Sequence, residues 1–175
     1  MDTKIAVYKA AVITSLLYGC ETWTLNKKQT ERLQKFHQTS LRRIAKIKWY
    51  HKRTNYKVLF LCNISSLESM IDRARLRWTG HVVRMENDRI PKALLYGRLD
   101  TGAPKRGNHN TYLNSVKSTL RACGIDCTQL EALALERNGW RASGKAGIVM
   151  AGGGRRQRLS EKRMRGRGKA VTVRQ

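Results

Sequence analysis

Two long segments of the chain repeat apolar side chains every three to four residues. This is the spacing of a helix that buries one face, and it does not suit the strict alternation of a half-buried strand. In residues 26–49 the apolar positions are Leu33, Phe36, His37, Leu41, Ile44 and Ile47. In residues 65–85 they are Leu67, Ile71, Ala74, Trp78, Val82 and Met85. The sequence therefore predicts an all-α fold, a small helical bundle.

Local signals place the helix ends. Asn26 can cap the first long helix, which is expected to run to about Trp49. Ser65 with Glu68, and Thr128 with Glu131, have the spacing of reciprocal capping boxes. Shorter helices are expected over residues 3–18, 91–99, 111–123 and 128–137. Residues 56–61 fit either a short helix or a strand.

The charge of the chain indicates a polyanionic partner. The chain has 36 lysines and arginines but only 12 acidic residues, which gives a formal net charge of +24. Cations follow the face opposite each apolar stripe, about one per helical turn, as a row of phosphates requires. A single row also fits a solvated face, but two rows together with the basic carboxy-terminal segment favour binding to a partner. The strongly positive charge favours nucleic acid over an anionic membrane as that partner. The expected binding residues are Lys35, Arg42, Arg43, Lys46, Arg73, Arg77, Arg84, Lys105 and Arg106.

Aromatic side chains suggest a second kind of contact. Trp49 and Tyr50 follow Lys48 and precede His51, so they are candidates for stacking on bases. Trp78 lies on an apolar stripe, where core packing is the better interpretation. The expected partners are therefore RNA, DNA or both, recognised with little sequence specificity, and no membrane.

The sequence does not indicate an enzyme. Two-metal polymerase or nuclease chemistry needs clustered carboxylates, and the chain has no adjacent aspartate pair. Cys123, Cys127 and His109 lack a fourth zinc ligand, so neither a metal nor a cofactor is expected. Four cysteines in a chain of this length favour reduced thiols. Without a recognisable secretory signal, we expect an intracellular protein, nuclear or cytoplasmic and not secreted.

Three segments together resemble one family. Residues 16–23 (LLYGCETW) resemble the segment that follows the palm in reverse transcriptases of non-LTR (LINE-type) retrotransposons. Residues 75–85 (RLRWTGHVVRM) are similar to a downstream signature of that family, and residues 136–141 (ERNGWR) to its terminal Asp-Arg-x-x-Trp-Arg motif. The resemblance implies a thumb-like bundle that holds template RNA and primer DNA beside a palm domain. The family's metal-binding aspartates match nothing in this chain.

The chain thus divides into three expected parts. Residues 1–50 form thumb-like helices and residues 51–142 a helical carboxy-terminal extension. Residues 143–175 hold ten lysines and arginines against one acid, Glu161, and few apolar residues, so a disordered Gly/Arg-rich tail is expected. The function expected from the whole is a non-catalytic nucleic-acid-binding fragment of an RNA-directed DNA polymerase. The alternatives are a non-functional retroelement relic or a working piece of an active reverse transcriptase.

Overall fold

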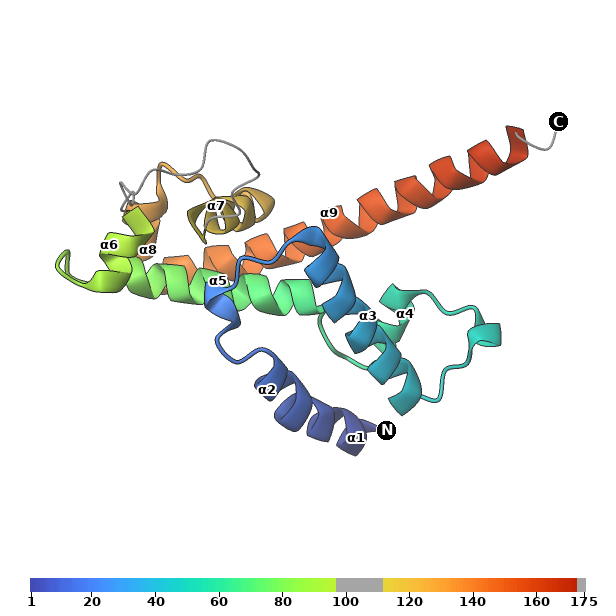
Figure 1. Ribbon diagram of the computed structural model, residues 1–175. Coiled ribbons are helices and arrows are strands. Elements are labelled where there is room, and N and C mark those ends of the chain that lie inside the picture. Colours follow the sequence, from blue (N-terminus) through green and yellow to red (C-terminus); the bar gives the residue numbers. More distant parts are fainter. Residues whose placement is uncertain (97–111, 173–175) are drawn as a thin grey trace.

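The computed structural model describes residues 1–96 and 112–172, and every regular element in these ranges is a helix (Figure 1). The prediction of an all-α fold is confirmed. A π-helical stretch, η1, joins α1 to α2 in one continuous run. The elements are α1 (Asp2–Val7), η1 (Tyr8–Ile13), α2 (Thr14–Leu16), η2 (Cys20–Thr22), α3 (Lys27–Ile44), η3 (Trp49–His51), α4 (Asn55–Leu61), α5 (Leu67–Val83), α6 (Ile90–Tyr96), α7 (Tyr112–Ala122), α8 (Leu130–Leu135) and α9 (Arg137–Thr172).

Helix α5 lies at the centre and contributes to two apolar cores. The first core, in the amino-terminal half, contains Ile5, Tyr8, Ile13, Leu41, Val58, Cys62, Ile64 and Leu67. The second contains Leu76, Val82, Val83, Leu95, Val116, Leu120, Cys123, Ile125, Ala134, Trp140, Ile148 and Ala151. Because neighbours cover α5 on several sides, its polar residues Asp72, Arg75 and Thr79 are buried as well.

Helix α9 lies antiparallel to α5 at close range and then extends beyond the bundle (Figure 1). Trp140 lies against Gly80, and its Nε1 donates a 2.9 Å hydrogen bond to the Leu76 carbonyl. Gly144 faces Leu76 one turn further on, and Gly147 faces Cys123, the residue that follows α7. Glycine at these positions lets helix axes approach more closely than larger side chains would allow.

The expectation of disorder from residue 143 is wrong for residues 143–161, which continue α9. Gly144, Gly147, Ile148 and Ala151 lie at helical spacing on the buried face. The composition argument missed this because glycine and alanine contribute little apolar side chain of their own. They nevertheless allow neighbouring residues to pack on the backbone.

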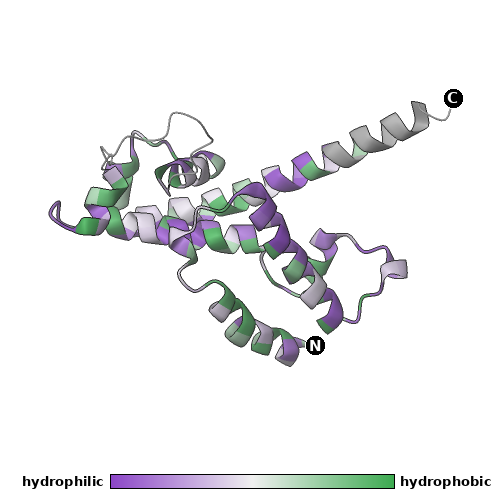
Figure 2. Cartoon of the chain, viewed as in Figure 1, coloured by the Kyte–Doolittle hydropathy of each residue, from purple (hydrophilic) through white to green (hydrophobic). Residues whose placement is uncertain are grey.

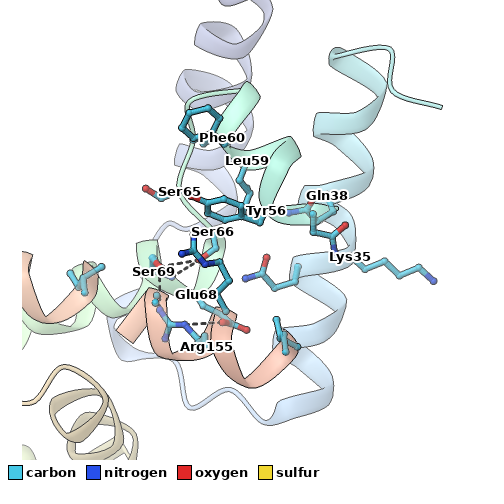
Figure 3. Close-up of a pocket in the computed structure, with 18 of the residues that line it drawn as sticks. Lys35, Gln38, Tyr56, Leu59, Phe60, Ser65, Ser66, Glu68, Ser69 and Arg155 are labelled. Carbon is cyan, nitrogen blue, oxygen red and sulfur yellow. Dashed lines mark hydrogen bonds and ion pairs between the residues drawn. The ribbon is translucent and has the colours of Figure 1, made fainter. Parts of the chain in front are cut away.

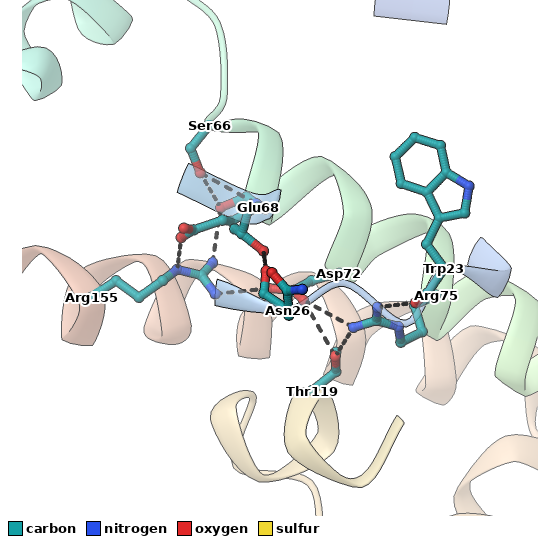
Figure 4. Close-up of polar contacts among 10 residues, drawn as sticks. Trp23, Asn26, Ser66, Glu68, Asp72, Arg75, Thr119 and Arg155 are labelled. Carbon is teal, nitrogen blue, oxygen red and sulfur yellow. Dashed lines mark hydrogen bonds and ion pairs between the residues drawn. The ribbon is translucent and has the colours of Figure 1, made fainter. Parts of the chain in front are cut away.

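A polar network ties α5 to α7, α9 and the segment before α3 (Figure 4). Asp72 accepts from Arg155 Nη1 at 2.8 Å, and Arg155 Nε also lies 3.3 Å from Glu68. Arg75 donates to Thr119 Oγ1 at 2.8 Å and to the Trp23 carbonyl at 2.9 Å. The acidic side chains of α5 are therefore used to hold the helices together.

Helix α3 begins as predicted and ends earlier. Asn26 Oδ1 accepts from Gln29 N, and Gln29 Oε1 accepts from Asn26 N, both at 2.9 Å. The helix ends at Ile44 because Lys46 adopts a left-handed conformation (φ 53°). Ile47 N then donates to the Arg42 carbonyl at 2.8 Å, the six-to-one bond of a Schellman motif. The predicted end at Trp49 was thus five residues too late.

Neither of the two predicted capping boxes forms. The cap of α5 is Ser66, one residue after the predicted Ser65, and its Oγ accepts from Ser69 N at 3.3 Å. Glu68 pairs with Arg155 instead of capping. The N-cap residue of α8 makes no side-chain cap, and Thr128 N instead donates to Asp126 Oδ1 at 3.0 Å.

Phe36, which was predicted on an apolar face, is exposed, whereas His37 is fully buried as expected. The Tyr8 hydroxyl lies 2.9 Å from His37 Nδ1, and His37 Nε2 lies 3.2 Å from the Ser65 carbonyl. This geometry fits a neutral ring with its hydrogen on Nε2. Burial lowers the pKa of His37, against a smaller opposing effect of the Ser65 carbonyl.

Apolar residues also follow the run from α1 to α2, much of which is green in Figure 2. Its residues Ile5, Tyr8 and Ile13 enter the first core, whereas Val7 and Val12 are exposed. None of the described helices combines the length and the apolar character needed to cross a bilayer.

Candidate nucleic-acid interface

A groove of about 1180 Å³ opens between α3 and α4 on one side and α9 on the other (Figure 3). The first turn of α5 lies between these helices. The groove is mixed in character. Tyr56, Leu59 and Phe60 of α4 supply apolar surface, and basic side chains of α3, α5 and α9 supply charge. Such a combination suits a ligand with both phosphates and flat apolar rings.

Three of the predicted binding residues line this groove, namely Lys35, Arg42 and Arg73. Lys35 and Arg73 are exposed, and Lys35 extends away from α3 in Figure 3. Arg42 is half-buried, and its Nη2 donates to the Arg53 carbonyl at 2.8 Å and to Asn55 Oδ1 at 2.9 Å. Arg42 therefore holds the loop after α3, while Lys35 and Arg73 remain accessible.

The other predicted residues do not line the groove. Arg43, Lys46 and Arg77 are exposed elsewhere on the surface. Arg84 is half-buried at the end of α5, and its Nη1 donates to the Ala134 carbonyl. Its pKa is lowered by burial and then by Arg137 and Arg141. Arg84 thus joins α5 to α8. Lys105 and Arg106 lie outside the described residues, and so does His109.

Two groove arginines were missed from the sequence, Arg155 and Arg156, because the segment that carries them was expected to be disordered. The guanidinium carbon of Arg156 lies 4.4 Å from the centroid of the Tyr56 ring. An arginine stacked in this way keeps its in-plane N–H donors available for phosphate. The signal that could have revealed them is the helical spacing of Trp140, Gly144, Gly147 and Ala151, which continues α9 towards the groove.

Few cations of the described residues are neutralised by acids. Among the described residues, only Arg75 and Arg155 have a side-chain nitrogen within 4 Å of a carboxylate oxygen, and the carboxylates are those of Glu68 and Asp72. Lys35, Arg73 and Arg156 therefore line the groove without a described carboxylate in salt-bridge range. The groove also contains Glu31 and Glu68, but the second is already paired with Arg155.

The tryptophans divide between core and surface. Trp140 is buried, and Trp78 is half-buried against the second core, as predicted. Trp49 is 87% exposed and Tyr50 is 58% exposed, in the short helix η3.

The three segments that resemble reverse transcriptases meet on α5. Arg75, in the second segment, donates to the carbonyl of Trp23, in the first. Gly80, also in the second segment, receives the indole of Trp140, in the third. These residues therefore act mainly in packing the bundle. The groove residues Lys35, Arg73 and Arg156 lie outside all three of the resembling segments.

The cysteines are unpaired, and their thiols at Cys20, Cys62 and Cys123 are buried. Burial raises the pKa of each of these three thiols. Within residues 1–96 and 112–172, no three His, Cys, Asp or Glu side chains gather as a metal site would require.

Comparison with known proteins links part of the chain to transposons. Over 94 residues it is 29% identical to an uncharacterised transposon-derived protein of Caenorhabditis elegans. This match covers 50% of the chain and 34% of the relative, so the chain spans about a third of that protein's length. No protein-family model matches the chain, and no solved structure matches it.

Proposed function

We propose that this chain binds RNA or DNA without catalysing a reaction, through phosphate contacts in the groove between α3, α4 and α9. The observation that carries the proposal is the set Lys35, Arg73 and Arg156, three groove cations without a described carboxylate in range. Like charges that line one groove repel each other unless a polyanion neutralises them. Contacts to a phosphate backbone carry no sequence information, so the specificity is low.

We further propose that the chain corresponds to the template- and primer-holding region of a non-LTR retrotransposon reverse transcriptase. The three resembling segments and the transposon-derived relative support this origin. In that setting a palm domain is the expected protein partner, and the catalytic aspartates belong to the palm. A primer-extension assay on the chain alone should give no product, whereas extension would favour the alternative of a working polymerase piece.

The binding test is a titration of labelled RNA and DNA over a series of salt concentrations. Each neutralised phosphate releases counter-ions, so the slope of log K against log salt becomes shallower by roughly 0.7–0.9 for each phosphate that is no longer neutralised. Replacing Lys35, Arg73 and Arg156 with alanine should lower affinity and reduce the slope by about 2–3. Affinity that is independent of salt would contradict the proposal.

The matched control removes the same charge elsewhere. Lys4, Lys117 and Arg121 are exposed and lie outside the groove. Their triple alanine variant has the same net charge as the groove variant, so it should keep most of the affinity. Equal losses in both variants would mean that overall charge, and not the groove, binds nucleic acid.

Two alternatives have their own readouts. A non-functional relic should unfold without cooperativity, which a circular-dichroism melt would show. A membrane-surface binder should float with anionic vesicles in the absence of nucleic acid.

A further inference from the structure

The loop between α3 and α4 presents aromatic rings to solvent at the edge of the molecule. We define residues 46–53 as the aromatic tip. Trp49 is 87% exposed and Tyr50 is 58% exposed. In Figure 1 the loop and its short helix η3 project away from the bundle. An indole ring this exposed is a large apolar surface in water, and interfaces are enriched in such rings.

The aromatic tip is held in a defined shape. Lys46 (φ 53°) and Lys52 (φ 46°) adopt the left-handed conformation at its two ends. Lys48 N donates to His51 Nδ1 at 3.0 Å, and Arg42 anchors the Arg53 carbonyl at 2.8 Å. A loop that is ordered before binding loses less conformational entropy when a ligand arrives.

The rings of the tip do not cover one another by parallel stacking. Trp49 and Tyr50 have centroids 5.9 Å apart and ring planes at 79°. Tyr50 and His51 are also edge-on, with centroids 4.6 Å apart and planes at 69°. Trp49 therefore keeps open ring surface on which a further flat group can stack.

The charge around the tip selects the kind of partner. The sequence holds no acidic residue between Glu31 and Glu68. Lysine and arginine occur nine times in that interval, at positions 32, 35, 42, 43, 46, 48, 52, 53 and 57. A flat apolar group accompanied by negative charge on both sides describes a nucleotide within a strand.

We propose that Trp49 stacks on the base of an unpaired nucleotide, while Lys48 and Lys52 contact the phosphates beside it. The base must be unpaired because a duplex keeps its bases stacked on each other. The inference rests on the proposed nucleic-acid function and adds the single-stranded class of ligand. Arg42 lines the groove, and its Nη2 donates to the Arg53 carbonyl of the tip, so this side chain connects the tip to the lining of the groove.

The test compares a short oligouridylate with an abasic strand of the same length, by fluorescence anisotropy at fixed salt. Trp49→Ala should weaken binding of the oligouridylate about tenfold or more, as loss of one stacked base does. It should leave binding of the abasic strand unchanged. Trp49→Phe should retain most of the affinity, because it keeps a flat ring. Tyr18, which is 86% exposed in another segment, supplies the control, and Tyr18→Ala should have no effect.

Several outcomes would overturn the inference. Equal losses for both strands would mean that Trp49 only shapes the loop, and no loss for either would mean that it does not touch the strand. If Trp49→Ala loses binding to phosphatidylserine vesicles but still binds the oligouridylate, the tip would be assigned to membranes. If the wild-type chain binds neither strand, the proposed function fails as well. If the groove variant keeps its affinity while Trp49→Ala loses it, only the groove assignment fails.

Discussion

Replacing Gly80 with alanine tests the packing of α5 against α9. A Cβ atom at residue 80 would overlap Nε1 of Trp140 and lie 2.6 Å from its Cδ1. The indole is 4% exposed and hydrogen-bonded to the Leu76 carbonyl, so it has little room to move. Gly80→Ala should therefore displace the ring or separate the helices.

The expected magnitude combines three effects. Overpacking a core typically costs about 1–3 kcal/mol. Loss of the Trp140 hydrogen bond adds about 1 kcal/mol. Alanine has a better helix propensity than glycine by about 1 kcal/mol, which offsets that loss. We expect Gly80→Ala to lower the free energy of unfolding by about 1–3 kcal/mol in chemical denaturation followed by circular dichroism.

Gly153 provides the matched control, because a Cβ there would meet nothing within 4 Å. Gly153→Ala in the same helix pair should raise the free energy of unfolding by up to about 1 kcal/mol. In a Trp140→Phe background, Gly80→Ala should lower the free energy of unfolding by less than it does in the wild type, because the effects of substitutions at two contacting residues are not additive. If Gly80→Ala stabilises the chain as Gly153→Ala does, the close contact of α5 with α9 is refuted.

Three further changes probe single contacts. His37→Gln should flatten the pH dependence of stability between about pH 7 and pH 5. Burial lowers the pKa of His37 in the folded chain below its unfolded value near 6.5. As the pH falls, the unfolded chain therefore binds a proton first, and the wild type loses stability. A wild type that gains stability on acidification over this range would contradict that sign. Asp72→Asn should lower the free energy of unfolding, measured in urea, by roughly 3 kcal/mol. This is the lower end of the range for breaking a buried ion pair, because the Arg155 side chain is 24% exposed and retains its ion pair with Glu68. Glu68→Gln, at a side chain 33% exposed, should cost at most about 1 kcal/mol, and equal costs would show that Asp72 is not the centre of the network. Asn26→Ala should cost about 1 kcal/mol in the same assay through loss of the cap on α3, and an unchanged midpoint would argue against that cap.

The sequence alone determined the helical character of the chain and the beginning of α3. Both depend on interactions between residues close in sequence. The period of Leu33, Leu41 and Ile44 reports which face a helix buries, and Asn26 caps through a residue only three positions away. Excess positive charge is likewise a property of composition. Tertiary contacts do not alter these facts, so sequence reasoning could reach them.

Only the tertiary structure decided which cations share a groove and which hold the fold. Arg42, Arg73 and Arg84 appear equivalent in a helical pattern, yet Arg84 ties α5 to α8 while Arg73 faces the groove. The order of residues 143–161 also depends on partners distant in sequence, since glycines stabilise a helix pair only when another helix fills the space they leave. A pattern along one helix cannot supply that information, because the neighbour of each face is set by how the whole chain packs.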